Sequence, residues 1–166
     1  MLHSTFLQAP DQSSAWTQLG DAIDTNYSYF AMAADRPIVA VRRGKSVLIY
    51  NLSDDFTSWT PIADAIDPQF TLPDDYLYGL ALSSDGGVVA IGYAAHDSRA
   101  GRVQIFAAHP ARGWVRLGSA INRGSGITIV FSLALLADGT VVAIAVYGNN
   151  GNNYGQVRVF KYMLIS

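Results

Sequence analysis

The sequence contains no cysteine, which excludes disulfides, thiol chemistry and cysteine-bound structural zinc. Charge is also scarce: 14% of the residues are charged, against about 25% in a typical globular domain, and the net charge is −2. Nucleic-acid binding depends on clustered Lys and Arg side chains. Arg42, Arg43 and Lys45 form the single basic cluster, which we interpret as a solvated loop. The composition therefore predicts no nucleic-acid partner.

Long uninterrupted apolar runs are missing too. The longest candidate covers residues 129–147, but Asp138-Gly139 divides it in the middle. A membrane helix needs about 20 predominantly apolar residues in a row, and Asp-Gly is a strong hairpin signal. This run therefore predicts two strands and a turn, with no insertion into a membrane. Residues 1–5 show no secretory signal pattern, and the compartment stays open.

Residues suited to catalysis do not occur in groups. The three histidines, His3, His96 and His109, are far apart and show no metal-ligand spacing. The neighbouring carboxylates Asp54-Asp55 and Asp74-Asp75 fit turns better than the opposed pair that a glycosidase needs. We expect no catalytic residue and no metal-ligand set.

What the sequence does contain is one phrase that occurs three times. It begins with a tryptophan and ends in Ala-Ile-Asp or Ala-Ile-Asn, at residues 16–24, 59–67 and 114–122. Each copy belongs to a longer unit whose other phrases also recur in a constant order. Repeats with a period of roughly 40–50 residues are typical of stacked or radial repeat folds. The chain is therefore predicted to be a repeat protein.

Each unit is interpreted as four strands. The first strand is expected at Phe30–Ala33, Gly79–Ser83 and Phe131–Leu136, and the second at Ile38–Val41, Val88–Gly92 and Val141–Val146. Both are continuous runs of Val, Ile, Leu and Ala, which predicts strands that are buried on both faces. The third begins at Val47, Val103 and Val157, and the fourth is the tryptophan phrase.

Small residues early in the unit and aromatic residues later fit a sheet that widens outward. No segment has a helical period. The sequence therefore predicts an all-β fold of β-propeller-like blades, each with four antiparallel strands, about three blades in all. We expect a single repeat domain over residues 1–166, with copies at approximately 25–67, 68–122 and 123–166. Residues 1–24 are expected to form the outer strands of a preceding or shared blade.

Three blades are fewer than the usual range of about four to eight. The sequence therefore predicts a partial propeller or one completed by oligomerisation. Two ways to complete it stay open: the remaining blades of a longer chain, or a homodimer in which the Trp16 strand joins the last blade of the other copy. Both rest on the tendency of exposed strand edges to pair.

The second copy carries a resemblance to a known family. Residues 75–92, which include Asp85-Gly86 and the Val88–Gly92 run, together with the Gly101–Phe106 phrase, resemble an FG-GAP repeat of integrin-alpha-type β-propellers. The resemblance implies a propeller fold and an extracellular or cell-surface location. The Phe-Gly pair of the family is replaced by Tyr76-Leu77 here.

Many FG-GAP members hold calcium in an Asp-rich loop between the second and third strands. The corresponding loops here are residues 94–100 and 148–154, which offer Asp97 or four asparagines. Calcium takes about six to eight oxygen ligands, often from carboxylates. Calcium is therefore disfavoured, and we expect no cofactor.

The predicted function is a non-catalytic binding or scaffolding module for a protein or glycan partner, because propellers bind through loops on a rigid ring. The candidate contact residues lie in and beside the two loops: Tyr93, His96, Asp97, Arg99, Tyr147, Asn149, Asn150, Asn152, Asn153 and Tyr154. Two alternatives stay open. One is a glycan-acting enzyme with acidic or histidine side chains in the axial channel, and the other is a purely structural repeat fragment.

Overall fold

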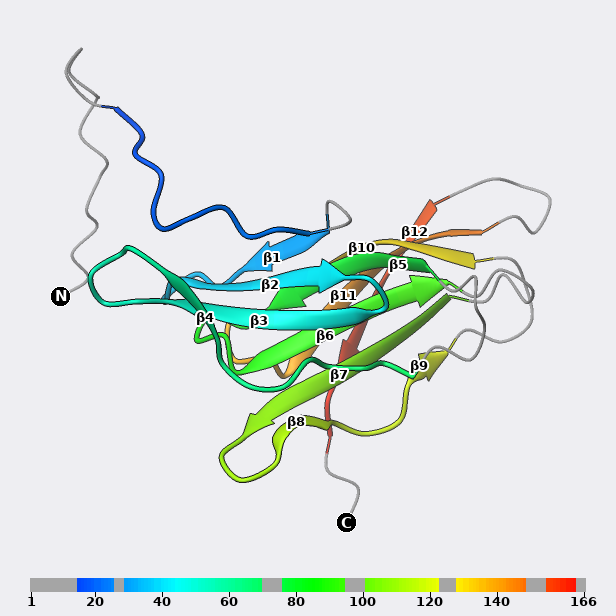
Figure 1. The fold of residues 1–166 in the computed structure, drawn as a ribbon. Coiled ribbons are helices and arrows are strands. Elements are labelled where there is room, and N and C mark those ends of the chain that lie inside the picture. Colours follow the sequence, from blue (N-terminus) through cyan, green and yellow to red (C-terminus); the bar gives the residue numbers. More distant parts are fainter. Residues whose placement is uncertain are drawn as a thin grey trace, which may run out of the picture.

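The fold is all-β and consists of three antiparallel sheets that follow one another along the chain (Figure 1). The structure is a computed structural model, and it describes residues 15–25, 29–69, 76–94, 101–122, 128–148 and 155–163. These ranges contain strands and no helix. Accordingly, no helix within them is long and apolar enough to cross a membrane.

The first sheet contains four strands in chain order, and the second contains four in chain order plus a fifth short strand. The first has the order β1 (Phe30–Met32), β2 (Ile38–Arg43), β3 (Ser46–Leu52) and β4 (Trp59–Pro61). The second has β5 (Tyr76–Leu82), β6 (Val88–Ala94), β7 (Gly101–His109) and β8 (Gly113–Arg116), and β9 (Ile121–Asn122) also pairs with β7. The third has β10 (Thr128–Leu135), β11 (Val141–Gly148) and β12 (Gly155–Lys161). The predicted blades of antiparallel strands are confirmed.

The three sheets share one register, which explains why the same phrases recur. Ala31 pairs with Ala40 in the first sheet, Ala81 with Ala90 in the second, and Ala134 with Ala143 in the third. The predicted first strands match β1, β5 and β10, and the predicted second strands match β2, β6 and β11. Their ends differ from the prediction by up to three residues.

A carboxylate closes the turn between the first and second strands. In the second sheet Asp85 Oδ1 accepts hydrogen bonds from Ser83 Oγ at 2.7 Å and from Gly87 N at 2.8 Å. In the third sheet Asp138 Oδ1 accepts from Thr140 N at 2.9 Å. The Gly after each Asp has a positive φ, so the predicted Asp-Gly hairpins are confirmed.

The fourth strand of the first and second units is interrupted, which the tryptophan phrase alone did not indicate. After β4, Ile62 N donates to Ile49 O at 2.9 Å, and the chain rejoins the edge of β3 where Ile66 pairs with Val47. The second sheet repeats this course. Leu117 N donates to Ile105 O at 2.7 Å, and the β9 residue Ile121 pairs with Val103. The three residues between the two contacts bow away from the sheet in both units.

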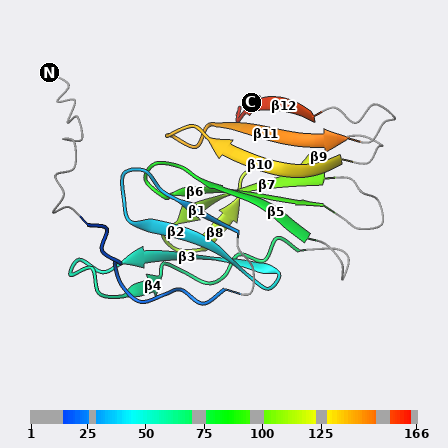
Figure 2. The same ribbon diagram turned by 90° about the horizontal axis from the view of Figure 1, so that it is seen from above.

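The sheets stack face to face, with the second sheet between the first and the third (Figure 2). One apolar cluster fills the space between the first and second sheets, where Ile49, Leu80 and Ile91 are buried. Another fills the space between the second and third sheets, where Val103, Leu133 and Ile144 are buried. The first strands β1 and β10 both lie beside β5, as expected for the innermost strands of neighbouring blades.

Burial on both faces holds for β6 of the middle sheet and, in β2 of the first sheet, for Ala40 and Val41, but not for the third sheet. Val89, Ala90 and Ile91 follow one another in β6, and all three are fully buried. In β10 of the third sheet Leu133 is buried whereas Ala134 and Ser132 are exposed. The prediction of two buried faces is therefore wrong for this strand, because one face of the third sheet has no sheet packed on it among the described residues.

The basic cluster also differs from the prediction. Arg42 is 4% exposed and belongs to β2, so it is not part of a solvated loop. Its Nε donates to Gly44 O at 2.8 Å and its Nη1 to Leu77 O at 3.3 Å on β5. The side chain thus joins the first sheet to the second. Arg43 and Lys45 are exposed, as the prediction has it.

Candidate functional site

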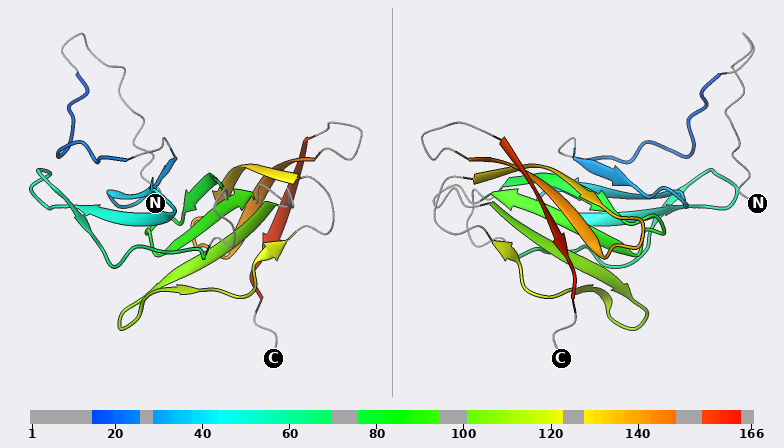
Figure 3. Two further views of the ribbon diagram at one scale, coloured as in Figure 1. Left: turned by 45° about the vertical axis from the view of Figure 1, so that its right-hand side comes forward. Right: turned by 180° about the vertical axis from the view of Figure 1, so that it is seen from behind.

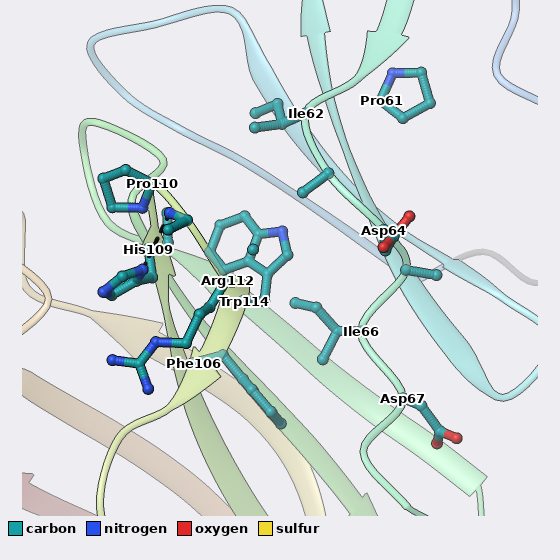
Figure 4. Close-up of a pocket in the computed structure, with 15 residues that line it drawn as sticks. Pro61, Ile62, Asp64, Ile66, Asp67, Phe106, His109, Pro110, Arg112 and Trp114 are labelled. Carbon is teal, nitrogen blue, oxygen red and sulfur yellow. Dashed lines mark hydrogen bonds between the residues drawn. The ribbon is translucent and has the colours of Figure 1, made fainter.

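A concavity of about 1110 Å³ lies between the first and second sheets, on their outer side. One wall is the bowed segment from Pro61 to Asp67, and the other is the β7–β8 hairpin from Phe106 to Trp114. We call it the outer groove. Figure 4 shows the Trp114 ring between the two walls, beside Ile66.

The interrupted fourth strand produces the first wall. Ile62 and Ile66 are tied to the edge of β3 by backbone hydrogen bonds, so the residues between them must bow outward. Ile66 is 4% exposed and faces the floor of the groove, whereas Ile62 is 43% exposed. The side chains of Asp64 and Asp67 lie on this wall and are exposed.

A tight hairpin forms the second wall. His109 pairs with Gly113, and Arg112 N donates to His109 O at 3.2 Å. Gly113 has a φ of 65°, a conformation that glycine adopts without strain. His109 Nδ1 accepts a hydrogen bond from Ala111 N at 3.2 Å, which orients the imidazole on the hairpin.

The floor of the outer groove is apolar, one wall carries basic residues and the other carries acidic residues. Phe106 is 7% exposed, and Trp114 is half-buried against the core between the sheets. Arg112 and His109 come from the hairpin wall, and Asp64 comes from the opposite wall (Figure 4). An aromatic floor with a few polar groups at the rim is the usual composition of a binding cleft.

Among the described residues, the carboxyls with a shifted pKa lie in turns and not in the outer groove. Hydrogen bonds from the Ser83 hydroxyl and Gly87 N lower the pKa of Asp85. Those from the Ser53 and Thr57 hydroxyls lower the pKa of Asp55, and those from Thr140 lower the pKa of Asp138. A general acid near neutral pH needs a raised pKa, so these three groups act as turn residues.

An enzyme site at the axis would draw on the first strands, which lie innermost. None of β1, β5 and β10 contains Asp, Glu or His. Among the described residues no three His, Asp or Glu side chains gather where they could hold a metal ion. The described inner strands thus offer no acid–base pair for the glycan-enzyme alternative.

The structure describes two of the residues that the sequence nominated for binding. Tyr93 lies in β6 and is 2% exposed, so packing between the sheets accounts for its side chain. Tyr147, near the end of β11, is 37% exposed. The other eight nominated residues lie outside the described residues: His96, Asp97, Arg99, Asn149, Asn150, Asn152, Asn153 and Tyr154. The loops weighed for calcium lie there too.

Sequence reasoning did not find the outer groove. Its residues looked like strand four and a hairpin, because Trp114 and Ile66 belong to the repeating phrase. The signal that could have indicated it is the His109–Gly113 hairpin, which places His109 and Arg112 directly before the phrase. The first unit has Ser53–Ser58 at the same place.

Comparison with known proteins assigns no family. No family model matches the chain, and no curated protein matches it. Among solved structures, it is similar to a chain from Bacteroides uniformis described as a 6-phosphogluconolactonase. The identity is 14% and the TM-score 0.47, over 80% of this chain and 41% of that one. It is also similar to a chain of a Mitotic Checkpoint Complex, with 15% identity and a TM-score of 0.35, over 98% of this chain and 57% of that one.

The chain thus spans about half the length of the solved structures that it resembles. Likenesses of this degree assign no activity. The propeller-like fold rests on the three antiparallel sheets of the chain itself and on their common register.

Proposed function

We propose that the chain is a non-catalytic propeller-like binding module and that the outer groove holds an extended segment of a protein partner. The observation that carries the proposal is the combination of an aromatic floor, Trp114 and Phe106, with an acidic wall and a basic wall. A peptide with apolar side chains and charges of both signs is complementary to this arrangement.

The backbone beside the groove supports an extended ligand. β8 is the last strand of the second sheet's path, and β7 is its partner. A strand with a free edge can accept another strand through main-chain hydrogen bonds, while pockets select alternate side chains. A protein segment supplies such a backbone and a glycan does not, so we favour a protein partner over a glycan. The FG-GAP resemblance and an extracellular location stay predictions.

A displayed library of random peptides tests the proposal, with the immobilised 166-residue chain as bait. Selected peptides should change the tryptophan fluorescence of a Trp16→Phe, Trp59→Phe variant, in which Trp114 is the remaining tryptophan. Ile62→Glu places a charge at the groove, and it should weaken binding by at least about tenfold, since a desolvated charge without a partner is costly. Val159→Glu on the third sheet is the matched control and should bind normally.

Two results would overturn the proposal. One is a library that yields no peptide sensitive to Ile62→Glu. The other is a glycan array in which the chain binds a sugar and loses that binding on Ile62→Glu while peptides do not compete. Circular dichroism of each variant checks that the fold is retained.

A further inference from the structure

Each sheet has two different faces, and the same residue positions form each face in every unit. The forward face points toward the next sheet along the chain, and the rear face points toward the preceding one. The forward positions are Ala40, Val47 and Ile49 in the first sheet, Ala90, Val103 and Ile105 in the second, and Ala143, Val157 and Val159 in the third. The rear positions are Phe30 and Met32, Leu80 and Leu82, and Leu133 and Leu135.

Forward faces pack on rear faces at both contacts within the chain. Between the first and second sheets, Val47 and Ile49 share a core with Leu80 and Leu82. Between the second and third sheets, Val103 and Ile105 share a core with Leu133 and Leu135. The forward position is 0% exposed at Val47 and 1% exposed at Val103. One kind of contact is therefore made twice.

The two outermost faces are one forward face and one rear face, the same two kinds of face that pack together at each contact within the chain. The third sheet presents a forward face on which Val157 is 70% exposed and Val159 is 66% exposed. The first sheet presents a rear face on which Phe30 is 69% exposed and Met32 is 62% exposed. Apolar residues of this size stay exposed together rarely in a monomer, and such patches mark interaction sites.

Shape supports the match between these faces. In the second sheet the forward positions Gly79 and Gly92 leave room for the next sheet: a Cβ at Gly92 would lie 2.7 Å from Val130 Cγ1. The third sheet has Ser132 and Ala145 at these two positions, which are also small. Ala145 and Val157 line a shallow apolar depression of about 380 Å³. The forward face of the third sheet can thus receive large rear-face side chains.

In the described ranges β12 has no fourth strand beside it, and residues 16–24 carry a copy of the fourth-strand phrase. In the described ranges β12 pairs with β11 alone, and residues 15–25 belong to no strand. Residues 16–24 are nevertheless a copy of the fourth-strand phrase, and Trp16 is fully exposed. Figure 3 shows β12 on the outside of the third sheet and the segment from residue 15 to 25 beside the first.

The segment is already held where a preceding fourth strand would lie. Gly20 N donates to Phe56 O at 2.9 Å, and Trp59 Nε1 donates to Leu19 O at 3.3 Å. The equivalent residues behave alike at the next two contacts. Ala63 lies against Gly113, where a Cβ added to the glycine would be 3.8 Å from Ala63 Cβ. Gly118 lies against Tyr162, where a Cβ added to the glycine would be 3.6 Å from Tyr162 Cε2.

We propose that a second copy of this chain docks head to tail on the third sheet. The rear face of its first sheet, with Phe30 and Met32, covers Val157 and Val159, and its Trp16 phrase adds a fourth strand to β12. The contact is heterologous, so two copies can make it twice and close a ring of six sheets, within the usual range of about four to eight blades. This surface is separate from the outer groove, so the two proposals stand or fall independently.

Sedimentation of the 166-residue chain across micromolar concentrations tests the docking. We expect a reversible dimer of twice the 17.9 kDa chain mass. Val159→Glu places a charge on the forward face and Phe30→Glu on the rear face, and each should leave a monomer, or weaken the dimer by at least about tenfold. Ile62→Glu, in the outer groove, introduces the same group elsewhere and should leave the dimer unchanged.

Mixing the two face variants separates a head-to-tail contact from a symmetric one. Each variant keeps one intact face, and together they provide one unmodified forward face and one unmodified rear face. The mixture should therefore form a one-to-one heterodimer, although each variant alone is monomeric. Longer oligomers that are sensitive to both variants would also support head-to-tail docking.

Three results would overturn the proposal. A chain that is monomeric at every concentration leaves these faces to further sheets of a longer chain or to another protein. A dimer that survives both face variants uses another surface. A dimer that is lost on Val159→Glu but not on Phe30→Glu pairs two forward faces. The variants are on exposed positions, and circular dichroism confirms that each one folds.

Discussion

Gly86 lies so close to Ile38 that a Cβ added to the glycine would be 2.7 Å from Ile38 Cδ1. The same relationship recurs one sheet later, where a Cβ at Gly139 would be 2.7 Å from Val88. The Asp-Gly turn of each sheet thus sits against the start of the second strand of the preceding sheet. Glycine is required at this position for two reasons: the positive φ of the turn and the close approach of the neighbouring sheet.

Alanine substitutions can separate these two reasons. Gly44 has a positive φ of 63° and no atom within 4 Å of its added Cβ, so Gly44→Ala should cost about 1 kcal/mol of unfolding free energy from backbone strain. Gly86→Ala should cost about 2–4 kcal/mol, because overpacking is added to the strain. Urea denaturation measures both, and equal losses would contradict close packing between the turn and Ile38.

Asp85 should make the stability of the second sheet depend on pH. Hydrogen bonds from the Ser83 hydroxyl and Gly87 N lower its pKa below the ordinary 3.8. A lowered carboxyl pKa stabilises the fold above the unfolded value, and this contribution is lost as the pH falls through the folded value. The difference in unfolding free energy between wild type and Asp85→Asn should therefore be largest near neutral pH and shrink below about pH 4.

Asp64→Asn, on the exposed wall of the outer groove, is the matched control for Asp85. As a surface substitution that also replaces a carboxylate by an amide, it should change the unfolding free energy at neutral pH by no more than about 0.5 kcal/mol. If the Asp85→Asn difference were constant from neutral to acid pH, the carboxylate charge would have no part in closing the turn.

The two neighbouring arginines should respond very differently to the same change. Arg42→Met removes the hydrogen bonds to the buried Leu77 O and the part-buried Gly44 O, so it should cost about 2–4 kcal/mol of unfolding free energy. Arg43→Met, at an exposed position, should stay within about 0.5 kcal/mol of wild type. Thermal and chemical unfolding of the pair measure the difference, and similar losses would mean that Arg42 does not link the sheets.

Gln104 is a position where a substitution should improve the protein. Its side chain is 8% exposed, and Oε1 has no hydrogen-bond partner among the described residues. The first sheet has Leu48 at the equivalent place. Gln104→Leu should raise the unfolding free energy by about 1–2 kcal/mol, because an unsatisfied polar atom leaves the core. A fall in stability would indicate that the amide has a role in the second sheet that packing does not reveal.

Most of the fold could be predicted from the sequence because each repeat has the same apolar strand pattern and, in two of the three copies, an Asp-Gly turn. Runs of Val, Ile and Ala located the inner strands, and Asp85-Gly86 and Asp138-Gly139 located their hairpins. Composition could not predict that Arg42 is buried, since one of its partners, the Leu77 carbonyl, belongs to a strand of the neighbouring sheet. Likewise, an apolar run in β10 does not indicate whether another sheet lies against each of its faces.

The outer groove could not be predicted from the sequence, because it too depends on how two neighbouring sheets pack. The outer groove arises because a bow in the first sheet's fourth strand faces a hairpin of the second sheet. Neither segment is unusual alone, and Asp64 and Trp114 are distant in sequence. The predicted contact residues were placed instead in and beside two loops that contain Asn and His residues, and most of those residues lie outside the described ranges.

The position of β6 between two cores has a consequence for the order in which the chain opens. Val89, Ala90 and Ile91 are 0% exposed, so their amides can exchange with solvent only when both neighbouring sheets separate. In stacked repeats stability accumulates through contacts with nearest neighbours, and terminal units fray first. In deuterium exchange the amides of β6 should be the last to be labelled and those of β12 among the first, while any molecule that covers the third sheet would slow β12 selectively.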